Sequence, residues 1–122
     1  MILVVAHQPE TRDALIPLIT RAGHPAAAVD CGEEVLKRVR FQKPSLVILD
    51  CGIADSFDTL ANIRAEPSAR STPVVMFSAD DENLMQKALL QGADAYVPKG
   101  SLDWSELLTE IRRFADTGPR PQ

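Results

Sequence analysis

The sequence has little of three features that mark particular classes of protein. Its two cysteines, Cys31 and Cys51, lack the spacing of a metal site and favour free thiols in a reducing compartment. Its 13 lysines and arginines against 17 acids give a net charge of −4, which argues against direct nucleic-acid binding. Its first hydrophobic run, Ile2–Ala6, is too short for a signal peptide or a membrane span. These absences predict a cytoplasmic domain that binds neither nucleic acid nor a membrane.

Glycine is also absent where a phosphate-cradling loop would need it. The segment that follows the first hydrophobic run, Ala6–Pro9, contains no glycine. Glycine-rich loops at this place hold the phosphates in nucleotide-binding α/β proteins. An enzyme or a nucleotide-binding protein remains an alternative, but this loop does not support it. We expect that the chain is not an enzyme.

Short apolar runs alternate with amphipathic segments along the chain. The runs predict buried strands at residues 2–5, 26–29, 46–49, 74–77 and 95–97. The segments between them predict helices over residues 10–22, 32–42 and 57–65, from Asp80 or Asp81 to Gln91, and from a cap at Ser101 or Asp103 to Phe114. Five strands alternating with five helices predict an α/β fold: a flavodoxin-like, doubly wound, five-stranded parallel sheet of order 2-1-3-4-5, with helices on both faces.

Helical spacing predicts which side chains each helix directs toward the core. In chain order they are Ala14, Leu15, Leu18, Ile19 and Ala22; Val35, Leu36 and Val39; Phe57, Leu60, Ala61 and Ile63; Leu84, Ala88 and Leu89; and Trp104, Leu107, Leu108, Ile111 and Phe114. Ion pairs from Glu33 to Lys37 and from Glu34 to Arg38 are expected on the solvated face of the second helix. The domain is predicted to span residues 1–116, with residues 117–122 as a flexible tail or the start of a linker.

Reactive side chains fall at the carboxyl ends of four predicted strands. They are His7, after Ala6, and Asp50, Ser78 and Lys99. Ligands of open α/β sheets bind beyond these strand ends, so we expect one pocket with Asp50 at its centre. A carboxylate is a competent nucleophile toward phosphorus, a lysine balances phosphoryl charge, and a serine donates a hydrogen bond to it. An aspartate at a strand end is also common in turns, and that alternative stays open for Asp50.

The chain resembles the receiver domain of bacterial two-component response regulators, the CheY-like family. The resemblance covers residues 1–115 and depends on several motifs in combination. They are ILVV followed by QPETR, CGEEVL, PSLVILD, IRAEP, PVVMFSA, ALLQGADAYVPK and the final amphipathic helix.

The resemblance implies a role for five residues. Asp50 matches the phosphoacceptor, Lys99 the lysine of the phosphoryl site, and Ser78 the switch hydroxyl. Tyr96 matches the aromatic residue whose rotamer follows that hydroxyl, and Gly52 the residue whose carbonyl binds Mg²⁺. The implied phosphodonor is a sensor histidine kinase or a phosphotransfer protein. A downstream protein, or a second copy of the chain, is expected to bind the surface formed by the fourth helix, fifth strand and fifth helix.

The sequence departs from the family pattern around the metal. Ala6 and His7 stand where receivers carry two acidic residues, which leaves Asp50 and Gly52 as metal ligands and predicts weak Mg²⁺ binding. The loop after Asp50 is short, and Gly100 replaces the proline that follows the lysine. His7 is expected to be an exposed loop residue, with a softer metal as the alternative. The chain is therefore predicted to be a phosphorylated receiver with a degenerate metal site or, alternatively, a phosphorylation-independent binding module.

Overall fold

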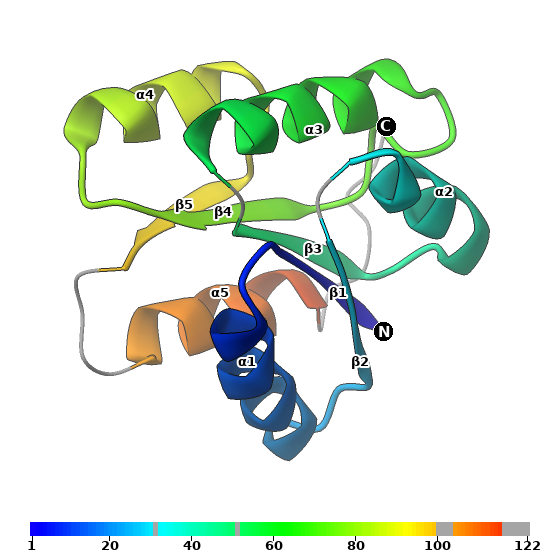
Figure 1. Cartoon of the computed structure of the whole chain (residues 1–122), viewed down its shortest axis with the longest axis vertical. Helices are drawn as coiled ribbons and strands as arrows, with labels where there is room; N and C mark the ends of the chain where they lie inside the picture. Colours follow the sequence, from blue (N-terminus) through cyan, green and yellow to red (C-terminus); the bar gives the residue numbers. More distant parts are fainter. Residues whose placement is uncertain (31, 51, 100–103, 116–122) are drawn as a thin grey trace.

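A computed structural model describes residues 1–30, 32–50, 52–99 and 104–115 of the chain. Within these residues strands and helices alternate, and the sheet is parallel throughout with order β2-β1-β3-β4-β5. Helices α1 and α5 lie on one face of the sheet, and α2, α3 and α4 lie on the other (Figure 1). The elements are β1 (Ile2–Ala6), α1 (Pro9–Arg21), β2 (Ala26–Val29), α2 (Glu33–Gln42), β3 (Leu46–Asp50), α3 (Ile53–Ala65), β4 (Val74–Ser78), α4 (Glu82–Leu90), β5 (Ala95–Pro98) and α5 (Ser105–Ala115). The predicted fold and strand order are confirmed.

The three middle strands, β1, β3 and β4, are buried along their whole length. In β3, Val47 and Leu49 contribute to the core that includes α2, α3 and α4, whereas Leu46 and Ile48 contribute to the core that includes α1 and α5. A strand covered on both faces needs apolar side chains on both, which explains the lack of alternation in its sequence. Among the described helices none is long and apolar enough to cross a membrane.

Most side chains predicted to face the core do so, but three are exposed. Leu89 was predicted to point inward and is 46% exposed, and Ala14 and Ala61 are exposed as well. The error at Leu89 follows from the orientation of α4, whose buried residue is Ala88. One further residue turns the side chain by about 100°, so Leu89 lies at the outer edge of the helix.

The ends of two helices show how local hydrogen bonds set their limits. Helix α3 begins at Ile53, not at Phe57 as predicted, because the N–H of Ser56 donates to the carbonyl of Gly52 over 2.9 Å and forms the first turn early. The predicted cap of α4 is confirmed, since Asp81 Oδ1 accepts the N–H of Asn83 over 2.9 Å. The predicted pair of Arg38 and Glu34 forms at 3.5 Å. The Glu33 side chain and the caps at Ser101 and Asp103 lie outside the described residues.

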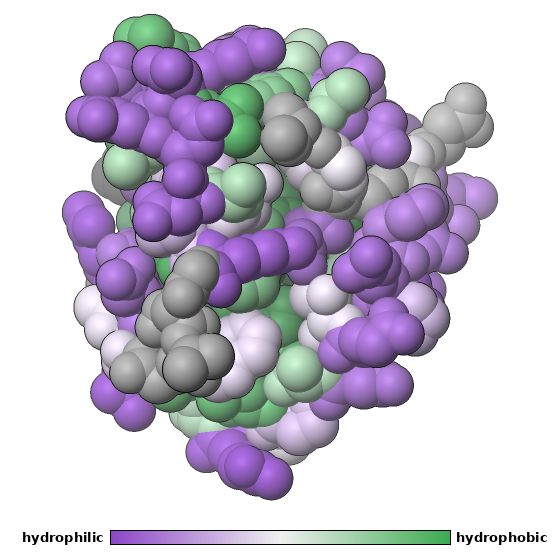
Figure 2. Space-filling view, turned by 60° about the vertical axis from the view of Figure 1, so that its left-hand side comes forward, coloured by the Kyte–Doolittle hydropathy of each residue, from purple (hydrophilic) through white to green (hydrophobic). Residues whose placement is uncertain are grey.

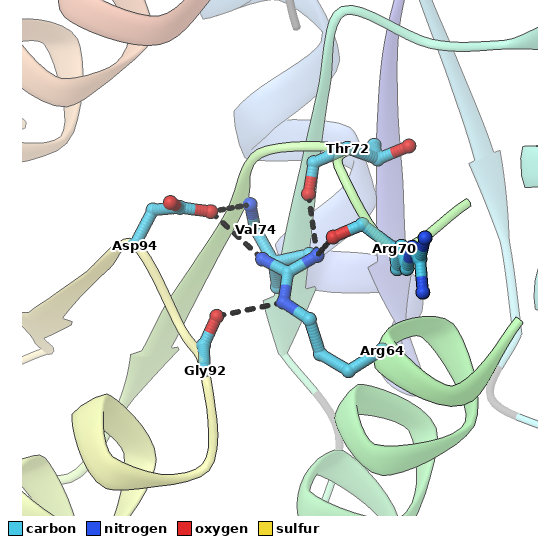
Figure 3. Close-up of polar contacts among 6 residues, drawn as sticks. All are labelled: Arg64, Arg70, Thr72, Val74, Gly92 and Asp94. Atoms are coloured by element: carbon cyan, nitrogen blue, oxygen red, sulfur yellow. Dashed lines mark hydrogen bonds and ion pairs between the residues drawn. The ribbon is translucent and has the colours of Figure 1, made fainter. Parts of the chain in front are cut away.

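Arg64 on α3 connects three segments at the amino end of β4 (Figure 3). Its Nε donates to the carbonyl of Gly92 over 2.8 Å, and its Nη1 donates to the carbonyls of Thr72 and Arg70 over 2.7 and 3.1 Å. Its Nη2 pairs with Asp94 Oδ2 at 2.8 Å. One guanidinium therefore fixes α3 against the turns before β4 and β5.

Asp94 and Gly92 are both required by this arrangement. The side chain of Asp94 is 5% exposed, and its Oδ2 also accepts the N–H of Val74 over 2.8 Å. Gly92 has φ +108°, and a Cβ there would lie 3.1 Å from Arg64 Nε. Gly92 thus ends α4, as predicted, and also leaves room for the arginine.

We predict that replacing Arg64 by leucine lowers the free energy of unfolding by about 3–5 kcal/mol, because it leaves the buried Asp94 carboxylate without its guanidinium. Denaturant unfolding measures this change. The control is Arg38→Leu, which breaks the more exposed pair with Glu34 and should cost less than about 1 kcal/mol. Equal losses in the two variants would contradict a structural role for the Arg64 cluster.

Candidate functional site

The predicted site residues meet at the carboxyl edge of the sheet. Ala6 lies opposite Asp50 in the register of β1 and β3, and the N–H of His7 donates to the carbonyl of Asp50 over 3.3 Å. On the other side, the N–H of Lys99 donates to the carbonyl of Ser78 over 2.7 Å. These main-chain bonds hold four strand ends side by side, as the predicted strand order requires.

Asp50 and Lys99 form an ion pair between Oδ1 and Nζ. The Asp50 side chain is 4% exposed, whereas that of Lys99 is 41% exposed. The lysine therefore approaches a buried carboxylate from the solvent side and neutralises its charge. This pairing agrees with the predicted placement of both residues and gives Asp50 a partner that a simple turn residue would not need.

Phe77 is a site residue that the sequence interpretation missed. The Nζ atom of Lys99 lies 5.5 Å from the centroid of the Phe77 ring, within the range of a cation–π contact. Phe77 precedes Ser78, and strand alternation places its side chain in the core under α1 and α5. The sequence signal that could have identified Phe77 is an aromatic residue at the end of β4 whose side chain lies on the face covered by α1 and α5.

Ser78 and Tyr96 lie close to the site on the opposite face of the sheet from Phe77. Tyr96 is buried in the core under α2, α3 and α4, and its hydroxyl donates to the carbonyl of Ala79 over 2.6 Å. Ser78 is 9% exposed. Tyr96 thus has an inward orientation and is anchored to the residue after Ser78. Its role as a switch stays a prediction.

The donor atoms near Asp50 do not fit Mg²⁺. Ala6 is fully buried and offers only a methyl group, and His7 is an exposed imidazole. The carbonyl of Gly52 already accepts the N–H of Ser56. Mg²⁺ needs several oxygen ligands in octahedral geometry. Within the described part of the chain, no three His, Cys, Asp or Glu side chains are grouped to hold a metal, so His7 has no companions there for a softer ion either.

A second cation lies at the end of β1. Arg12 Nη1 donates to the carbonyl of Ala6 over 2.9 Å and pairs with Asp30 Oδ1 at 2.8 Å. Asp30 neutralises this guanidinium. Lys99 therefore remains the cation in contact with the carboxylate of Asp50 among the residues described.

An open groove of about 860 Å³ runs between α2 and α3 and reaches His7. Asp50, Ser78 and Lys99 are not among its lining residues, so it is not the expected pocket centred on Asp50. A view toward the carboxyl edge of the sheet shows hydrophilic residues around less polar ones (Figure 2). The predictions at Gly100, Cys31, Cys51 and residues 117–122 lie outside the described residues.

Comparison with known proteins agrees with this geometry. A sequence model described as response regulator receiver domain matches residues 2–112. The transcriptional activator protein IrlR of Burkholderia pseudomallei is 34% identical over 120 residues, which are 96% of this chain and 51% of that protein. The chain spans about half the length of the curated transcriptional regulators it matches.

Solved structures of low sequence identity share the fold. The receiver domain of NtrX from Brucella abortus superposes with a TM-score of 0.85 at 24% identity, over 97% of this chain and 100% of that one. The receiver domain of sensor histidine kinase PA1611 from Pseudomonas aeruginosa PAO1, with magnesium in its active-site cleft, has a TM-score of 0.81 at 20% identity, over 94% and 96%.

We predict that Tyr96→Phe lowers the free energy of unfolding by about 0.5–1.5 kcal/mol, because the hydrogen bond to the carbonyl of Ala79 is lost. Denaturant unfolding measures the loss. Thr109→Val is a control, since it removes a hydroxyl whose bond to the carbonyl of Ser105 is exposed on the surface of α5. If Tyr96→Phe were no more destabilising than this control, the inward anchoring of Tyr96 would be unimportant for stability.

Proposed function

The chain belongs to the response regulator receiver domain family, which acts in two-component signalling, and we propose that Asp50 accepts the phosphoryl group at a site with weak metal binding. The observation that carries the proposal is the buried Asp50 carboxylate paired with Lys99 at the carboxyl end of β3. A buried carboxylate with one cationic partner suits a nucleophile that must later carry extra negative charge. Receiver domains are generally not enzymes, apart from the phosphotransfer to their own aspartate.

The proposed step is a phosphoryl transfer to one carboxylate oxygen of Asp50. The oxygen forms a bond to phosphorus, the bond between phosphorus and the donor breaks, and the donor leaves with the electron pair. Lys99 supplies positive charge to the new phosphoryl oxygens, and the Ser78 hydroxyl donates a hydrogen bond to them. The donor is a sensor histidine kinase or a phosphotransfer protein, in agreement with the partners of the family.

The metal site is the finer part of the proposal. Receiver domains typically bind Mg²⁺ at an acidic site, and Asp50 with the Gly52 carbonyl is what remains of such a site here. Ala6 and His7 supply no oxygen in place of the usual acids. A divalent cation contributes several kcal/mol of charge stabilisation to such reactions, so its loss should slow labelling.

We predict that acetyl phosphate labels the wild-type protein at least about a hundredfold more slowly than an ordinary receiver, a difference of roughly 3 kcal/mol in activation free energy. Intact mass measures the labelling, and Asp50→Asn is the blank. Below millimolar metal the rate should depend little on Mg²⁺. His7→Asp combined with Ala6→Asp should restore both metal binding and labelling, because Asp50, Ser78 and Lys99 are already in place.

Two outcomes would change this reading. Rapid labelling of the wild type in Mg²⁺ would show that Ala6 and His7 do not impair the site. A double variant that binds Mg²⁺ and still fails to label would move the cause to the short loop after Asp50 or to the segment that follows Lys99.

The proposed output surface is the face formed by α4, β5 and α5. These elements carry Gln86, Lys87, Gln91, Glu110, Arg112 and Arg113, together with Tyr96, whose side chain is buried in this structure. Leu90 on α4 is 88% exposed and gives this helix apolar area that a partner could cover. A downstream protein or a second copy of the chain is the proposed occupant.

Amine crosslinking tests this surface, because Lys87 lies on α4, whereas Lys37 lies on α2 and Lys43 directly follows α2. We predict that crosslinks between copies, or to a partner, form through Lys87 on α4 and are lost in Leu90→Asp. Phe41→Asp is the matched control, since Phe41 on α2 is also exposed, at 72%. Crosslinks confined to Lys37 on α2 and Lys43 directly after it would place the surface elsewhere.

A phosphorylation-independent binding module is the second candidate. The poor metal donor set favours it, because Ala6 and His7 offer Mg²⁺ no carboxylate oxygen beside Asp50 and phosphoryl transfer in the family depends on that ion. A measurement of partner binding separates the two candidates, since a module of this kind would bind its partner equally well as wild type and as Asp50→Asn.

A further inference from the structure

Three contacts join Asp50 to the start of α5. The first is the ion pair from Asp50 to Lys99, and the second places the Lys99 ammonium 5.5 Å from the Phe77 ring centroid. In the third, the Phe77 and Trp104 rings pack with centroids 5.6 Å apart and planes at 37°. A charged group and the beginning of a helix are thus connected through consecutive side chains.

The sheet and α5 fix the position of each side chain in this series. Phe77 is 7% exposed and belongs to the core under α1 and α5, and Trp104 packs against the same core. Trp104 directly precedes α5 and was predicted to be a packing residue, which the structure confirms. Their ring separation lies within the range of favourable aromatic pairs. Tyr96 belongs to the other core, so this series is separate from the Ser78 and Tyr96 side of the site.

The Lys99 ammonium is shared between an anion and an aromatic face. Its position therefore depends on where negative charge lies at Asp50. A phosphoryl group would place anionic oxygens farther from the sheet than the carboxylate oxygens, and charge-assisted hydrogen bonds would draw the ammonium outward. The ammonium would then leave the face of Phe77, and the ring that supports Trp104 would lose one of its neighbours.

We propose that Phe77 is a positioning residue for Lys99, and that its contact with Trp104 transmits a change of charge at Asp50 to the start of α5. The inference rests on the proposed function in one respect, because phosphorylation of Asp50 is the event that changes the charge. The coupling itself exists in the unphosphorylated chain and can be measured there.

Trp104 is the single tryptophan of the chain, so the tryptophan fluorescence reports on the surroundings of this one residue. Asp50→Asn removes the anion that holds Lys99. We expect a red shift of the emission maximum and easier quenching by acrylamide, with an about two- to fivefold change in the ratio of packed to unpacked Trp104, as a cation–π contact at a partly exposed site supports. Lys99→Gln should shift the emission in the same direction, and the double variant should not exceed the larger single effect.

Substitutions at Phe77 separate coupling from simple packing. In Phe77→Leu the emission should no longer respond to Asp50→Asn, whereas Phe77→Tyr keeps the ring face and should retain the response. Circular dichroism establishes that each variant is folded. If Phe77→Leu is unfolded, the comparison of Phe77→Tyr with Lys99→Gln still tests the proposal, because only the latter removes the ammonium.

The chain offers a matched control on the other face of the sheet. Lys87 Nζ lies 4.4 Å from the Phe57 ring centroid, a similar contact without a link to Trp104 in the described residues. Lys87→Gln should leave the emission unchanged.

The proposal is overturned if folded Asp50→Asn leaves emission and quenching unchanged, or if folded Phe77→Leu keeps the full response. Failure of acetyl phosphate to label Asp50, combined with a normal response to Asp50→Asn, would instead overturn the proposed function and leave the coupling in place.

Discussion

The burial of β3 on both faces is the constraint from which the arrangement of the site follows. Residues 46–49 are apolar and fully buried, so helices must cover both faces of the sheet, with β1 and β4 as neighbours. The first polar residue after this run, Asp50, emerges where the carboxyl ends of the neighbouring strands meet. Its carboxylate cannot be fully hydrated there, and a buried charge needs a partner. Lys99 is that partner. It directly follows β5, and the strand order brings the carboxyl end of β5 to the same edge of the sheet as Asp50.

The sequence was sufficient for features that depend on short-range patterns. Apolar runs located every strand, and their alternation with amphipathic segments was enough to predict the order of the sheet. The placement of Asp50 and Lys99 at one edge followed from that order, because the carboxyl ends of parallel strands share an edge. The cap at Asp81 was equally local, since it needs only a side-chain acceptor two residues before a free N–H.

What could not be predicted depends on contacts between distant segments. Arg64 reads as a surface residue of a helix, yet it donates to main-chain carbonyls from two later turns, whose positions only the folded chain defines. Leu89 fits a helical spacing, but the rotation of α4 on the sheet is decided by which neighbour, here Ala88, can approach closely. Phe77 was predicted to lie in a strand, and this is confirmed. Its contact with Lys99 could not be predicted, because the contact depends on the conformation of the Lys99 side chain, which follows β5.

If Asp50 is phosphorylated as proposed, the lack of acidic residues at Ala6 and His7 changes what has to differ between two states of this domain. A switch responds to a phosphoryl group only as far as that group interacts differently with the two arrangements. Where a divalent ion is bound tightly, much of that difference arises at the metal. Here Ala6 and His7 supply no oxygen ligand, and Arg12 is neutralised by Asp30. The difference must then come mainly from Lys99, the cation that contacts the carboxylate. Because Lys99 also contacts Phe77, any movement that improves its pairing with a phosphoryl group weakens its contact with the ring. Under the proposed coupling, the electrostatics of the site and the packing before α5 would depend on this one side chain.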